Sequence, residues 1–68
     1  MPSVKLSSGL HLVVFDSIGG WFVSLCGEEG PILKASNGPL NTGSWPTKAE
    51  AIADMHALAL ADAAHGIF

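Results

Sequence analysis

The chain has 68 residues, of which 49% are hydrophobic and only 13% are charged, about half the usual charged share of roughly 25%. So short a chain buries only roughly 60% of its unfolded surface, so we expect apolar side chains at the surface, where they mark an interaction site. The formal net charge is −3 and arginine is absent, which argues against nucleic-acid binding because phosphate contacts need clustered Lys or Arg.

The sequence also argues against a membrane span and against secretion. Its longest unbroken apolar run, Ala57–Ala61, is far shorter than the roughly 20 residues that span a bilayer. The start, MPSVKLSSG, lacks the cationic and apolar regions of a signal peptide. Cys26 is the single cysteine, so no internal disulfide can form. We therefore expect a cytoplasmic protein in a reducing compartment, without a membrane partner.

Two apolar runs, residues 10–16 and 21–26, predict the central hairpin of an antiparallel sheet. Its turn centres on Ile18-Gly19 or on Gly19-Gly20, and both registers put the same residues on the same face. One face carries Leu10, Leu12, Val14, Trp21, Val23 and Leu25. The opposite face carries His11, Val13, Phe15, Phe22, Ser24 and Cys26. We expect the first face, all aliphatic apart from one Trp, to lie under a helix.

Further strands are predicted on both sides of this hairpin. Residues 3–6 give a fourth strand in one version of the sheet. Gly27-Glu28-Glu29-Gly30 is typical of a turn with a bulge at Gly30. The strand that follows, residues 31–35, is expected to be short and at an edge, because Pro31 cannot donate a ladder hydrogen bond. We place Leu33 on the helix-facing side.

Residues 48–65 are rich in alanine and contain no Gly or Pro, which favours a single helix. Thr47 and Glu50 predict a capping box, in which each side chain accepts the backbone N–H of the other residue. Gly66 occupies the position where a left-handed residue ends a helix. The stripe expected to face the sheet consists of Ala49, Ile52, Met55, His56, Ala59 and Ala63. Leu58 and Leu60 flank it about 160° apart, so one sheet face does not bury both.

The order of these elements predicts a single domain, residues 1–68, of the α+β class. We expect two layers: a three-stranded, or four-stranded, antiparallel β-meander with one C-terminal helix packed on one face. A loop at 36–46 joins the layers, with Leu40 and Trp45 as its anchors to the core. In this fold the second sheet face has no covering element, so Phe15 and Phe22 need a neighbouring chain to shield them.

We considered catalytic and metal sites and predict neither. Cys26 and His11 lie opposite each other in one hairpin register, but no third orienting group, oxyanion site or pocket accompanies them. A free cysteine is more often a small buried hydrophobe. His56 and His65 are about 180° apart around the helix and cannot chelate one ion. The glycine turns precede no helix and have no phosphate-binding spacing. We therefore expect no enzyme activity, no cofactor and no metal.

The segment GGWFVSLCGEEGPILKAS, followed by GSWPTKAEAIADMHALAL, resembles small bacterial and phage strand-strand-strand-helix domains. These include the N-terminal-like domain of HicB-type antitoxins and several uncharacterised families. The matching residues are Trp21, Val23, Thr47, Glu50 and Ala51. The resemblance implies the fold and a non-enzymatic binding role. An antitoxin also needs a DNA-binding segment, and none is recognisable in these residues.

We therefore expect a small protein-interaction module that forms a homodimer and also binds an unidentified protein, as an inhibitor or a regulator. The proposed contact residues are Val13, Phe15, Phe22, Ser24, Cys26, Leu58 and Leu60. One alternative is a small-ligand-binding or enzymatic domain that uses the loop at 36–45. The other is a nucleic-acid accessory protein, which the absence of arginine disfavours.

Overall fold

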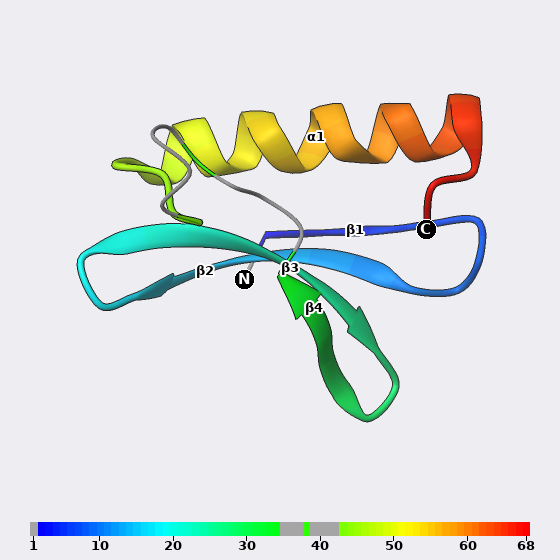
Figure 1. Ribbon diagram of the computed structural model, residues 1–68, viewed down its shortest axis with the longest axis horizontal. Helices are drawn as coiled ribbons and strands as arrows, with labels where there is room; N and C mark the ends of the chain where they lie inside the picture. The colour runs from blue at the N-terminus through cyan, green and yellow to red at the C-terminus, as the bar shows by residue number, and fades with distance from the viewer. Residues whose placement is uncertain (1, 35–37, 39–42) are drawn as a thin grey trace.

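A computed structural model describes residues 2–34, 38 and 43–68, with the backbone alone for residues 31–34. One helix lies across one face of a four-stranded antiparallel sheet (Figure 1). The strand order is β1-β2-β3-β4, so each strand pairs with its neighbour in the sequence. The two-layer α+β meander predicted from the sequence is thereby confirmed, with the N-terminal strand included.

The four strands follow the predicted ranges closely. They are β1 (Ser3–Lys5), β2 (His11–Ser17), β3 (Gly20–Gly27) and β4 (Gly30–Lys34). The last residue of the predicted fourth range, Ala35, lies outside the described residues, as does the predicted anchor Leu40. The edge position of β4 is confirmed. The placement of the Leu33 side chain falls outside what is described, although the backbone of Leu33 pairs with Leu25.

The central hairpin takes the register centred on Ile18-Gly19, in which Ser17 pairs with Gly20 and Phe15 pairs with Phe22. Because side chains alternate between the faces of a strand, this register sends one predicted set into the core. The fully buried aliphatic residues of the hairpin are Leu12, Val14, Val23 and Leu25. Leu10 and Trp21 pack against them as half-buried neighbours. The face predicted to lie under the helix is therefore the buried one.

The irregularity in the β3–β4 pairing lies elsewhere than expected. We predicted a bulge at Gly30, but Gly27 pairs directly with Gly30, and the register shifts between Leu25 and Cys26. Leu25 pairs with Leu33 and Cys26 with Pro31, so β4 holds the extra residue. Since Pro31 has no N–H for the ladder, the regular pattern cannot continue through this position. A bulge bends the strand and increases its twist.

Helix α1 (Lys48–His65) begins and ends where the sequence predicted. The Thr47 hydroxyl accepts the N–H of Glu50 at 3.2 Å, which is the expected N-cap. The reciprocal half of the capping box differs, because the Glu50 carboxylate accepts the hydroxyl of Thr47 at 2.9 Å. At the other end Gly66 is left-handed, with φ 62° and ψ 43°, and donates to the carbonyl of Asp62 at 2.7 Å.

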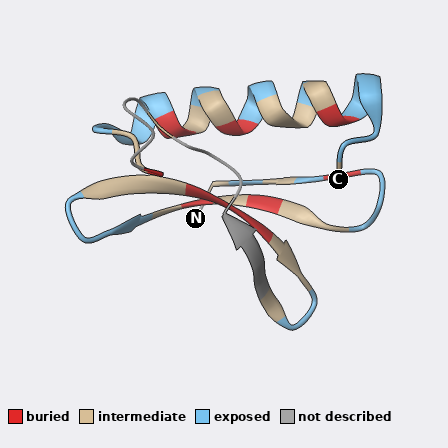
Figure 2. Cartoon of the chain, in the orientation of Figure 1, coloured by how far each residue is buried: buried red, intermediate tan, exposed pale blue. Residues whose placement is uncertain are grey.

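The buried face of α1 agrees with the predicted stripe only in part, since Met55 is buried and Ile52 and Ala59 pack against the core. Ala51, Met55 and Asp62 are buried, and they lie on the side toward the sheet (Figure 2). Three members of the predicted stripe are exposed instead: Ala49, His56 and Ala63. The helix is rotated by about 90° around its axis relative to the prediction. Alanine dominates every side of this helix, so the few larger side chains, with Met55 fully buried, decide which side packs.

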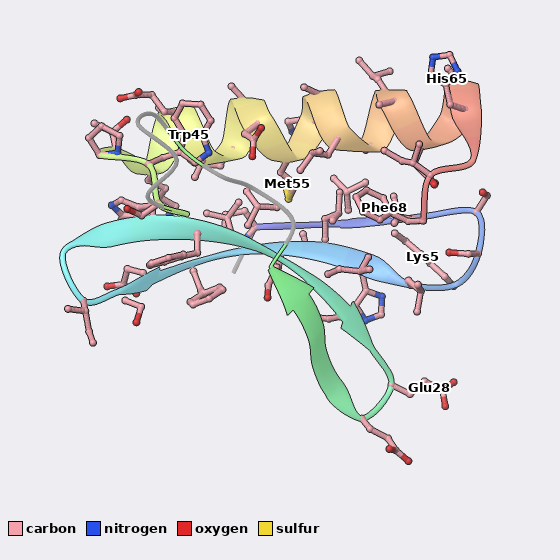
Figure 3. The ribbon with its side chains drawn as sticks, viewed as in Figure 1. Lys5, Glu28, Trp45, Met55, His65 and Phe68 are labelled. Atoms are coloured by element: carbon pink, nitrogen blue, oxygen red, sulfur yellow. The ribbon has the colours of Figure 1, made fainter. Side chains whose placement is uncertain are left out.

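The last residues of the chain complete the core near β1. Phe68 packs against the core cluster, and its backbone N–H donates to Oδ1 of Asp62 at 2.8 Å. In Figure 3 the Phe68 side chain lies between the end of α1 and β1. Leu6, which follows β1, is also buried. The N- and C-terminal segments thus share one end of the core.

The segment that leads into α1 is held against β3 by a short bridge at Trp45. Trp45 and Trp21 exchange two backbone hydrogen bonds, of 2.9 and 2.7 Å. Gly20 leaves the space for this approach, since a Cβ there would lie 2.7 Å from the Cβ of Ser44. The Trp45 side chain packs against the core, which confirms it as an anchor. The bridge sets the position of the chain two residues before the N-cap of α1.

A candidate protein-binding face

The sheet face turned away from α1 holds the residues predicted to contact a partner. We call it the far face and define it by six side chains that alternate with the core residues of β2 and β3: His11, Val13, Phe15, Phe22, Ser24 and Cys26. All six are partly or fully buried. The register pairs them directly as three cross-strand couples, so the face is a continuous band two strands wide.

The phenylalanines form the apolar centre of one end of the far face. The rings of Phe15 and Phe22 are stacked, with their centroids 5.5 Å apart and their planes inclined by 18°. Each ring is half-buried. An aromatic pair at this separation gains about 0.5–1.5 kcal/mol beyond the area that it buries. Stacking therefore holds the two rings together as one apolar cluster on the far face.

The middle and the other end of the far face are more polar. Ser24 is only 6% exposed although it lies away from the helix, because it sits in an inner strand between paired neighbours Val13 and Lys34. Cys26 is a half-buried free thiol, and its Sγ lies 4.0 Å from the carbonyl oxygen of Ser24. His11 lies directly across from Cys26. These residues can contribute hydrogen bonds to a contact that the phenylalanines fill.

The charged residues near the far face lie at one end of the sheet. Lys5 pairs with His11 at the edge of the sheet and is exposed, and Glu28 lies at the tip of the β3–β4 hairpin (Figure 3). Both are at the same end of the sheet, opposite the phenylalanine pair. None of the six residues that define the far face is a carboxylate. Because Lys5 lies on the same side of the sheet as its pairing partner His11, a partner surface has to match an apolar centre with a positive charge at one end.

The two helix residues predicted as contacts differ in their surroundings. Leu58 is half-buried and packs against the core, whereas Leu60 is 72% exposed on the outer side of α1. This agrees with the prediction that one sheet face does not bury both. Two further exposed hydrophobic residues escaped the sequence analysis: Ile18, which is fully exposed, and Ile67, which is 51% exposed. Ile18 lies in the turn next to the phenylalanine pair.

Within the described part of the chain, no three His, Cys, Asp or Glu side chains are grouped so that they could hold a metal ion. His56 and His65 are both exposed on α1, and Figure 3 shows His65 pointing away from the sheet. Cys26 and His11 pair directly across the hairpin, as one of the two predicted registers requires. Among the described residues, no third His, Cys, Asp or Glu joins them to form a group that could hold a metal ion.

Two buried polar atoms lie outside the far face, one just before α1 and one within it. Nε1 of Trp45 and Oδ2 of Asp54 are buried, and neither has a hydrogen-bond partner among the described residues. One is a donor and the other an acceptor. A buried polar atom without a partner costs about 1–3 kcal/mol. This is the structural observation that favours the alternative function, capture of a small molecule near the loop at 36–45.

Comparison with known proteins yields no match to a family model, a curated protein or a solved structure. The resemblance to HicB-type antitoxin domains therefore stays a prediction. In the described ranges of the chain, no helix has the length and apolar character required to cross a membrane.

Proposed function

We propose that this chain is a small, non-enzymatic protein-interaction module of the cytoplasm that forms a homodimer through its far face. In this form it regulates or inhibits a protein partner. The observation that carries the proposal is the stacked pair Phe15–Phe22, presented on the sheet face that α1 does not cover. Aromatic side chains at the centre of an apolar patch are the usual anchors of protein interfaces.

Three further observations support this function. The far face has no carboxylate among its defining residues, so burial of its phenylalanine end desolvates little charge. Its rings are already ordered by stacking, which lowers the conformational entropy that binding must overcome. The core beneath it contains only seven buried hydrophobic residues among those described, and small domains of this kind gain stability from association.

The test is the mass of the protein in solution, measured by light scattering over a dilution series. We expect a dimer at high micromolar concentration that dissociates on dilution. The double variant F15S/F22S should stay folded by circular dichroism and should be monomeric at every concentration. The matched control is L60S, which removes an exposed apolar side chain from α1 and should leave the dimer unchanged.

Two results would reject this assignment. A wild-type chain that is monomeric at high micromolar concentration would remove the homodimer. A dimer that survives F15S/F22S but is lost in L60S would move the interface to the outer side of the helix. A concentration-dependent melting temperature that disappears in F15S/F22S gives an independent reading of the same interface.

The second candidate is a small-ligand-binding function, favoured by the buried Nε1 of Trp45 and Oδ2 of Asp54, which lack a hydrogen-bond partner among the described residues. A ligand group that donates a hydrogen bond to the Asp54 carboxylate would satisfy that oxygen. A thermal-shift screen of nucleotides and metabolites tests it, with D54N as the variant. A stabilisation that is present in the wild type and lost in D54N would favour this candidate.

A further inference from the structure

We draw no further inference here: the strongest candidate, the side-chain cluster in which Lys5, His11 and Cys26 lie in one row across an end of the far face, carries nothing because it holds a lone thiol and no described group beside it shows which ligand or partner would cover it.

Discussion

The carboxylate of Asp62, in the last turn of α1, accepts the backbone N–H of Phe68, which lies three residues beyond the end of the helix. The distance from Oδ1 to the nitrogen is 2.8 Å. Asp62 is only 5% exposed and lies on the face of α1 that packs on the sheet. Its backbone carbonyl also accepts the N–H of Gly66. One residue thus ends the helix and holds the Phe68 side chain against the core.

Replacing this carboxylate should therefore loosen the C-terminal end of the core. We expect D62A to lower the free energy of unfolding by about 1.5–3 kcal/mol, the usual value for a hydrogen bond to a charged group. Urea denaturation measures it. E29A removes an exposed carboxylate at a hairpin tip and is the control, with an expected change below about 0.5 kcal/mol. Equal effects of the two variants would show that the Asp62–Phe68 contact contributes nothing.

The N-cap of α1 gives a second prediction. In T47A the N–H of Glu50 loses its acceptor, so the free energy of unfolding should fall by about 1 kcal/mol. T47S keeps the hydroxyl and should retain most of the stability. Thermal unfolding of the three chains, followed by circular dichroism, makes the comparison. A T47S chain as unstable as T47A would mean that the methyl group of Thr47 matters and the hydrogen bond does not.

A third prediction concerns the close approach of the chain to β3. In G20A the new Cβ would lie 2.7 Å from Cβ and 2.8 Å from Oγ of Ser44, so the bridge between Trp21 and Trp45 must shift. We expect a loss of about 1–3 kcal/mol, the usual range for overpacking. S44G removes the clashing atoms, so in a double-mutant cycle it should recover part of the loss. Strictly additive effects would contradict the contact.

The rotation of α1 is open to a direct test. Met55 belongs to both the predicted and the observed face and is 2% exposed, so M55A should cost about 2–5 kcal/mol in either case. A matched pair of charge insertions separates the observed face from the predicted one. A51E puts a carboxylate at a fully buried position and should unfold the chain, whereas A63E adds one at an exposed position and should be tolerated. A stable A51E chain would show that the helix packs through another side.

These residues also show how far the sequence alone could lead. Strand alternation is a strong signal, so the core set of Leu12, Val14, Val23 and Leu25 followed directly from it. The helix limits followed from Thr47 and Gly66, whose roles are local. The far face could be predicted for the same reason as the core, because side chains alternate along a strand and those that do not enter the core point to the opposite face.

What the sequence could not fix depends on contacts between distant residues. The prediction of the buried face of α1 was partly wrong because alanine gives every side of the helix nearly the same polarity. In addition, Asp62 is buried, and its carboxylate accepts the backbone N–H of Phe68. Stacking of Phe15 on Phe22 needed the register, which the turn glycines left open between two choices. The hydrophobic pattern of the sequence gave no indication of the bend of the β3–β4 hairpin or of the full exposure of Ile18.

The Trp21–Trp45 bridge constrains where α1 can begin relative to the sheet. Its two backbone hydrogen bonds hold residue 45 beside β3, only two residues before the N-cap Thr47. Any change that weakens the bridge should therefore also disturb the packing of the first turn of α1 on the sheet.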